Sequence, residues 1–257
     1  MKRTDPTYRR GFLGRMLGVA AAGFVSVGAA EAQTKAAEPQ TKKAAAPASG
    51  PDAWISEVKG THRCLFDFPQ HKNGAPLLHI LNYLNTYKEA YKAAPGSAGA
   101  VGTLYAIGGQ SSMPLAFNDA MWAKYALGDY TGMKDASGKG YTRNVLYRPT
   151  ANDAHLLTQA FQTPNIPELL DAVPGMGIEN LQKMGTKFIM CANAFGAWTF
   201  ELQARGKGKA DALQKELMAN LLPGVTHEAN IVAVAGEAGA ELVGEPPGIR
   251  AVFHLLT

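Results

Sequence analysis

Apolar residues follow two alternating patterns along this chain. Short apolar runs at 63–68, 101–107 and 187–191 predict buried strands, because continuous runs of four to eight apolar residues are typical of strands in a parallel sheet. Between the first two runs, residues 77–84 place four apolar side chains at the helical spacing i, i+3, i+4 and i+7. Strand and helix therefore alternate from the first recognisable element onward.

The same reading extends to the rest of the chain. Further helices are expected at 113 to about 127, 155–161, 178–184, 195–205, 211–221 and 232–240. Further strands are expected at 144–147, 225–231 and 250–255. Ser111 and Ser112 are suited to cap the helix that begins at Met113, whereas the glycine-rich stretch 128–141 predicts irregular structure.

Repeated strand–helix–strand units define the fold class. They predict an α/β protein with a parallel sheet and helices on both faces, a three-layer sandwich. The segment from 108 to 177 is longer than a crossover requires. Excursions of this length usually form lids or subunit contacts.

The first 32 residues carry the features of a twin-arginine signal peptide. Arg9 and Arg10 precede Phe12-Leu13, an apolar segment follows at 16–27, and Ala30-Glu31-Ala32 has the small-x-small pattern of a cleavage site. We therefore expect export by the twin-arginine machinery and a periplasmic location. An uncleaved N-terminal anchor is the alternative interpretation.

Residues 33–52 predict a flexible linker. They are rich in Ala, Lys, Gln and Pro and contain no aromatic residue, so they cannot bury enough apolar area to offset the entropy of ordering the backbone. Residues 53–257 remain for a single α/β domain, and this length is sufficient for one sizeable core.

Most of the net positive charge of the chain lies in its N-terminal residues. The whole sequence has 25 basic and 21 acidic side chains. Residues 1–32 hold five of the basic and two of the acidic ones, so the rest of the chain has 20 basic and 19 acidic side chains. A nearly neutral domain offers no basic face for phosphates, so we expect no nucleic-acid partner.

The chain has two cysteines, Cys64 and Cys191. An oxidising compartment would allow a disulfide between them, but the two residues lie at opposite ends of their predicted strands, so we expect no bridge. Neither a C-x-x-C, an H-x-x-x-H nor a haem-attachment motif occurs, so the sequence predicts no metal site and no cofactor.

Two stretches carry a family resemblance. They are Gly185-Thr-Lys-Phe-Ile-Met-Cys191-Ala-Asn-Ala, which is followed by a predicted helix, and Leu222-Pro-Gly224-Val225, which opens the next strand. In this order they resemble the DsrE/DsrF-like family of sulfur-handling proteins, over roughly residues 63–240. The resemblance implies a flavodoxin-like α/β sandwich and a homo-oligomer. For some members it also implies a cysteine that carries sulfur as a persulfide, and Cys191 matches that cysteine.

Cys191 is the candidate catalytic residue. It is expected at the carboxyl end of a parallel strand, where open α/β sheets bind ligands, and directly before a helix whose positive end favours a thiolate. The thiolate is the form that attacks sulfane sulfur. This chemistry requires a sulfur atom open to solvent. A small buried hydrophobic residue is the alternative interpretation of a free cysteine.

His71 is the candidate partner of that thiol. It follows the first predicted strand, and there it could face Cys191 and stabilise a thiolate or shuttle a proton. A solvated loop histidine is the other interpretation.

Four further residues are candidates for binding a small sulfur species or another anion. Gly109 and Ser111 follow the second strand and open a helix, an arrangement suited to an anion cradle but without the spacing of a nucleotide motif. Asn193 could orient a bound oxyanion, and Arg143 could neutralise it.

These observations support three functional hypotheses. The first is an exported DsrE-like protein that binds or relays sulfane sulfur through Cys191, as a sulfur carrier or a sulfurtransferase. The second is a non-catalytic oligomeric protein of binding or assembly, in which the thiol is buried. The third is a metal-binding exported protein that uses His62 or His71.

Overall fold

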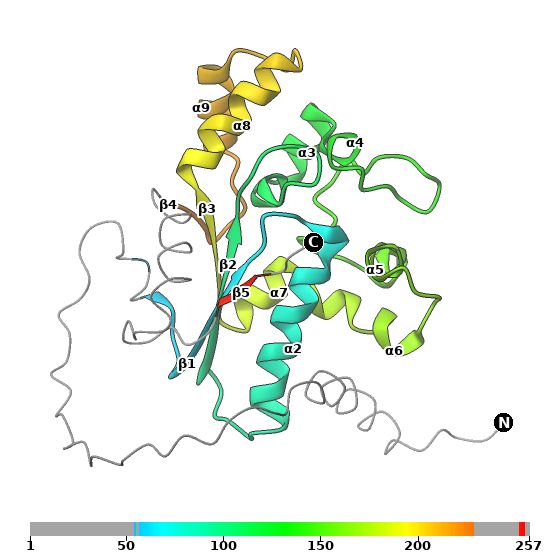
Figure 1. Ribbon diagram of the computed structural model, residues 1–257, viewed down its shortest axis with the longest axis vertical. Helices are drawn as coiled ribbons and strands as arrows, with labels where there is room; N and C mark the ends of the chain where they lie inside the picture. Colours follow the sequence, from blue (N-terminus) through cyan, green and yellow to red (C-terminus); the bar gives the residue numbers. More distant parts are fainter. Residues whose placement is uncertain (1–53, 55–56, 229–251, 255–257) are drawn as a thin grey trace, which may run out of the picture. The chain divides into compact units, whose positions relative to one another are not determined.

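The computed structural model describes residues 54, 57–228 and 252–254. Their centre is a parallel sheet with the strand order β4-β3-β2-β1-β5 (Figure 1). Its strands are β1 (His62–Asp67), β2 (Ala98–Leu104), β3 (Thr186–Cys191), β4 (Val225–Glu228) and β5 (Val252–His254). Every pairing in the sheet is parallel, so the predicted α/β fold class is confirmed.

Helices are interleaved with these strands. The α-helices are α2 (Ala75–Glu89), α3 (Asp119–Tyr125), α4 (Leu127–Thr131), α5 (His155–Phe161), α6 (Pro167–Leu170), α7 (Ile178–Lys183), α8 (Ala192–Ala204) and α9 (Ala210–Met218). The 3₁₀ helices bounded by described residues are η2 (Lys72–Gly74), η3 (Met113–Ala116), η4 (Ala151–Asp153) and η5 (Val173–Met176).

The strand order determines where the helices lie. From β1 to β4 each step moves in the same direction across the sheet, and right-handed crossovers that all move one way place their helices on one face. Accordingly α2, α5, α6 and α7 lie on one side of the sheet in Figure 1. This sequential order differs from the 2-1-3-4-5 order of flavodoxin, and the second helix layer of the predicted three-layer sandwich is not seen in the described residues. The helix predicted at 232–240 lies outside the described residues.

The larger core fills the helix-covered face. Alternate strand residues point into it, among them Cys64 and Phe66 of β1 and Phe188 of β3. Gly102 of β2 lies beneath Phe188, and a Cβ atom at this glycine would come within 2.7 Å of the phenyl ring. The sheet therefore needs glycine here to admit the aromatic side chain.

The opposite face carries a smaller cluster. The segment before β1 crosses it so closely that a Cβ atom on Gly99 would lie 2.2 Å from the carbonyl oxygen of Lys59. The buried residues of this cluster are Trp54, Val58, Leu65, Val101, Ile189 and Cys191. We call it the Trp54 cluster.

The helix predicted at 113–127 is divided into three pieces. Asn118 interrupts it, because its backbone is extended and its side chain accepts a hydrogen bond from the Met121 N–H to cap α3. Ala126 then adopts a left-handed conformation with φ 53°, which ends α3 before α4 begins. Of the two predicted capping residues, Ser112 makes no capping hydrogen bond with its side chain, whereas the Ser111 hydroxyl accepts from the N–H of Met113, the first residue of η3, at 3.0 Å.

The strand predicted at 144–147 is a turn. The Tyr147 N–H donates to the Asn144 carbonyl oxygen at 3.0 Å, and the Asn144 side-chain amide donates to the carbonyl oxygens of Leu115 and Phe117. The other predicted strands and helices of the described residues are present, most of them to within a few residues at their ends, whereas α6, η2, η4 and η5 were not predicted.

One buried carboxylate organises the excursion at 108–177. Asp153 accepts hydrogen bonds from the Tyr141 hydroxyl, from the Arg143 guanidinium and from both the backbone and the hydroxyl of Thr150. Burial by itself raises the pKa of Asp153, but the bonds from Thr150, Tyr141 and Arg143 outweigh it, so the pKa is lowered overall.

We expect Asp153→Ala to lower the free energy of unfolding by about 2–4 kcal/mol, since it leaves several polar groups without their partner. The carboxylate has a lowered pKa in the folded state. Its contribution is therefore present above the unfolded pKa of Asp and is lost as the pH falls through the folded value. Urea denaturation at pH 7 and at pH 3 should show a difference between wild type and variant that shrinks in acid.

Lys124→Ala, which breaks the exposed pair with Glu216, serves as the control and should lower the free energy of unfolding by less. Equal losses in the two variants would contradict this account.

Candidate functional site

Cys191 occupies the predicted position but not the predicted environment. It is the last residue of β3 and the N-cap of α8, with no side-chain hydrogen bond in that cap. Its exposed fraction is 0 %, because its side chain belongs to the Trp54 cluster. The expectation of a solvent-open sulfur is therefore wrong: the period of two directs Cys191 to the same face as Ile189, into the buried cluster that also contains Trp54 and Val58.

Three hydrogen-bonded polar side chains lie beside the Trp54 cluster, at the carboxyl ends of the central strands. The buried carboxylate of Asp67 accepts hydrogen bonds from the Thr103 hydroxyl at 2.8 Å and the Tyr105 hydroxyl at 3.0 Å. Tyr105 also packs against the Trp54 cluster, which contains Cys191. We did not single out Asp67, Thr103 or Tyr105 from the sequence. The available signal was a polar residue near the carboxyl end of an apolar strand.

The electrostatics of this group favour the protonated form of Tyr105. Burial raises its pKa, and the charge of Asp67, the hydrogen bond to Asp67 and the proximity of Cys191 raise it further. Tyr105 therefore remains a hydrogen-bond donor to the carboxylate. Such a closed arrangement stabilises the strand ends and leaves the Cys191 thiol among mostly apolar neighbours.

Cys64 and Cys191 are separated in two ways. They belong to clusters on opposite faces of the sheet, and β2 lies between their strands. Cys64 is in register with Ala100, Ala100 with Thr186, and Cys191 lies five residues beyond Thr186, roughly 16 Å along the strand. The two cysteines form no disulfide with each other, as predicted. Burial raises the pKa of Cys64 to about 12, so this thiol stays protonated and unreactive.

His71 is buried instead of solvated, with an exposed fraction of 1 %. Its Nδ1 accepts a hydrogen bond from the Asn73 N–H at 3.1 Å, which leaves Nε2 to donate to the Gly109 carbonyl oxygen at 3.3 Å. Burial lowers its pKa to about 4, and its hydrogen bonds to the backbone offset only part of that effect. The ring thus links the loop after β1 to the loop after β2. His71 therefore has a structural role here, in place of the predicted role as partner of a Cys191 thiolate.

Gly109 and Ser111 hold the backbone of the loop after β2. The Ser111 hydroxyl donates to the carbonyl oxygens of Tyr105 and Ala106, both at 2.9 Å, and accepts from the Met113 N–H. The Gly109 carbonyl oxygen accepts from His71. The Ser111 hydroxyl and the Gly109 carbonyl oxygen of the expected cradle are therefore engaged within the chain.

Asn193 and Arg143 lie in separate places. Asn193 is exposed on the first turn of α8. Arg143 forms a two-pronged pair with Asp153, with Nη2 at 2.7 Å and 2.8 Å from the two carboxylate oxygens, so it neutralises a carboxylate of the chain itself. The anion-binding residues expected from the sequence do not form a single site around Cys191.

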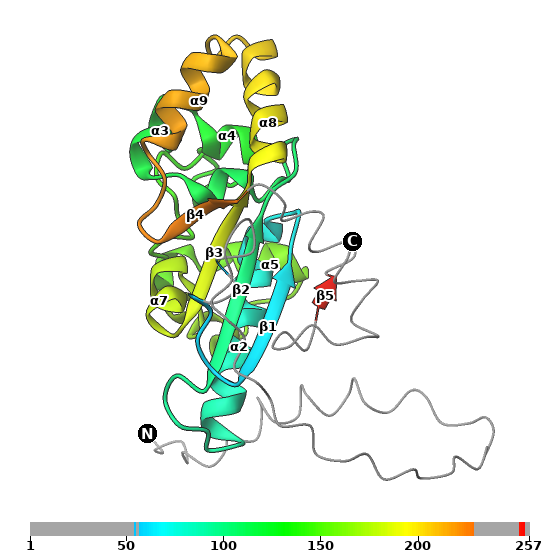
Figure 2. The ribbon, with the colours of Figure 1, turned by 90° about the vertical axis from the view of Figure 1, so that its left-hand side faces the viewer.

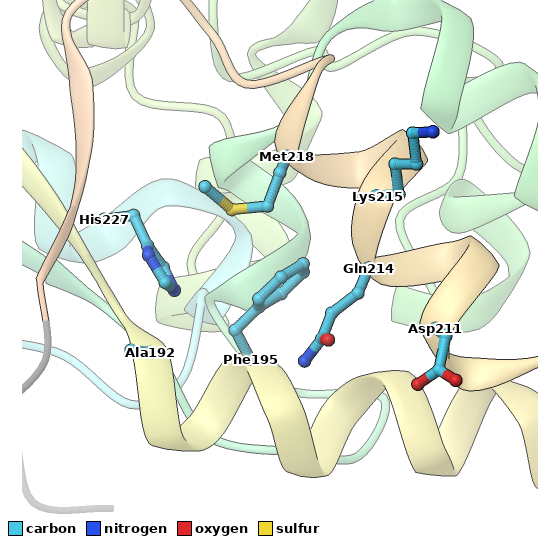
Figure 3. A pocket seen from close by; sticks show the side chains of 7 residues that line it. All are labelled: Ala192, Phe195, Asp211, Gln214, Lys215, Met218 and His227. Atoms are coloured by element: carbon cyan, nitrogen blue, oxygen red, sulfur yellow. The ribbon is translucent and has the colours of Figure 1, made fainter.

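An open groove lies elsewhere, between β4, the start of α8 and one face of α9. Its volume is about 520 Å³, within the range usual for ligand sites. The ring of His227 meets Phe195 edge-on at 5.7 Å between centroids (Figure 3). Burial lowers the pKa of His227, with the Glu228 charge opposing it. The groove is lined by Ala192, Phe195, Asp211, Gln214, Lys215, Met218 and His227.

The groove was not predicted from the sequence, although one signal pointed to it. Residues 211, 214, 215 and 218 have the helical spacing i, i+3, i+4 and i+7 and form a mixed polar and apolar stripe on α9. That stripe is the face of α9 which Figure 3 shows along the groove.

The described part of the chain has no group of three His, Cys, Asp or Glu side chains close enough together to hold a metal ion. His62 instead stacks on Tyr87 at 4.5 Å between ring centroids. None of the helices in these residues combines the length and apolar character that a membrane crossing requires.

Comparison with known proteins adds no assignment. No family model matches the chain, and neither the curated proteins nor the solved structures contain a match. The resemblance to the DsrE/DsrF-like family stays a prediction from the sequence.

We expect the buried His71 to make the protein sensitive to moderate acid. A histidine whose pKa is lowered from 6.5 to about 4 stays neutral in the fold, while the unfolded chain takes up a proton between these values. Stability therefore falls as the pH drops through this window, by on the order of 3 kcal/mol at its lower end. His71→Gln, which cannot titrate, should show a shallower loss in urea denaturation between pH 7 and pH 4. Nuclear magnetic resonance should place the midpoint of His71 near pH 4, and a midpoint near 6.5 would contradict the burial argument.

Proposed function

We propose that this protein is an exported, DsrE-like α/β protein that works by binding and not by thiol chemistry. The observation that carries the proposal is the complete burial of Cys191 in the Trp54 cluster. A sulfur carrier must present its sulfur atom to a donor and an acceptor, and this thiol meets hydrocarbon side chains on most sides.

The groove between β4, α8 and α9 is the proposed working surface. It is open and presents aromatic, sulfur-containing and charged side chains from three different elements. Binding sites of α/β proteins commonly lie outside the carboxyl ends of the strands, and this groove adjoins the point where β3 passes into α8. A homo-oligomer in the periplasm remains part of this proposal.

Sulfane-sulfur relay through Cys191 is the second candidate. The specific observation in its favour is the position of Cys191 at a strand end and directly before the thirteen-residue helix α8, next to the hydrogen-bonded pair of Tyr105 and Asp67. This arrangement would favour a thiolate if solvent reached the sulfur atom.

Thiol reactivity distinguishes the two candidates. We expect native protein to react slowly with Ellman's reagent at neutral pH and to release two equivalents only after denaturation, because both cysteines are buried. After exposure of the native protein to polysulfide, mass spectrometry should find no added sulfur on Cys191.

Cys64→Ala and Cys191→Ala are the matched controls, since each leaves one thiol to report. Rapid modification of Cys191 in the Cys64→Ala protein, with sulfur adducts that disappear in Cys191→Ala, would overturn the binding proposal and establish the sulfur relay in its place.

A further inference from the structure

Among the described residues, no strand pairs with the outer edge of β4. In the sheet as described, β4 is the terminal strand and is hydrogen-bonded only to β3 (Figure 2). An edge strand presents a row of backbone N–H and C=O groups that can pair with another extended chain. Charged or covered edges usually prevent this, and on β4 only Glu228 is charged.

The groove reaches β4 at the His227 side chain and has two chemically different ends. Near β4 it is apolar, where Phe195, Met218 and the ring of His227 come together (Figure 3). Farther along α9 it is charged, where Asp211 and Lys215 lie one helical turn apart. An occupant must therefore combine an apolar group with polar or charged neighbours.

The charges of this end are available to an occupant. Among the ion pairs of the described residues, Glu216 of the same helix is paired with Lys124, whereas Asp211 and Lys215 are paired with no side chain. Because they differ in sign, they complement a chain that carries both a basic and an acidic residue.

An edge strand beside a groove under a helix is the geometry in which proteins bind extended peptides. The peptide adds to the sheet as one more strand, its backbone provides affinity, and every second side chain enters the groove and provides specificity. A compact small molecule would use the groove but would leave the backbone groups of β4 without partners.

We propose that β4 and α9 form a binding site for an extended peptide segment. The segment pairs with the outer edge of β4, places one apolar side chain against Phe195, Met218 and His227, and directs charged residues to Asp211 and Lys215. This inference rests on the proposed binding function and specifies its ligand as a polypeptide.

A phage-displayed library of random dodecapeptides, selected on the purified full-length protein, is the test. We expect enriched peptides in which an apolar residue is flanked at alternate positions by polar or charged residues. Met218→Lys should weaken the binding of synthetic copies by about tenfold or more, because it places a charge in the apolar end of the groove. Phe200→Lys, on an exposed face of α8 outside the groove, should leave binding unchanged.

Backbone pairing has its own control. N-methylation of the peptide at one alternating set of amides should abolish binding, while methylation of the other set should be tolerated, since only alternate residues of an added strand direct their backbone N–H groups toward β4.

Failure to enrich any peptide, tolerance of both methylated sets, or equal binding by wild type and Met218→Lys would overturn the proposal. So would an oligomer that Met218→Lys dissociates, because the groove would then be an interface between copies. Each of these results could occur with Cys191 inert, so the inference can fail while the binding function stands.

Discussion

The parallel register of β1, β2 and β3 is the constraint on which the rest of the structure depends. Side chains alternate between faces along a strand, so the register assigns Cys64 to the core beneath the helices and Cys191 to the Trp54 cluster. The same alternation brings Asp67, Thr103 and Tyr105 together at the strand ends. A slip of one residue would exchange the two faces and with them the environment of every candidate side chain.

The sequential strand order has a second consequence. Because β1 to β4 advance in one direction, α2, α5, α6 and α7 gather on one face, and Trp54 and Val58 belong to the buried cluster on the other. The same order leaves β4 at an edge beside α9. The burial of the thiol and the exposure of the groove thus follow from the same topology. The buried thiol argues against the sulfur relay, and the exposed groove argues for a binding function.

Hydrogen-bonding side chains in the long excursion serve structure. Asp153 engages Arg143, and His71 joins the loops after β1 and β2 through Asn73 and Gly109. Residue type alone makes such groups resemble ligand-binding residues, since a basic side chain or a loop glycine suits an anion equally well. Their burial and their hydrogen-bond partners within the chain show that these groups have structural roles.

The sequence by itself determined the alternation of strands and helices, the boundaries of β1, α2, β3 and α8 to within a few residues, and the position of Cys191 at a strand end. Local apolar periodicity encodes these features, so no long-range contact is needed to read them. Only the tertiary structure decided which face Cys191 occupies, that it shares a buried cluster with Trp54, and that His227 meets Phe195 edge-on. These depend on contacts between residues far apart in the chain, which local periodicity does not encode.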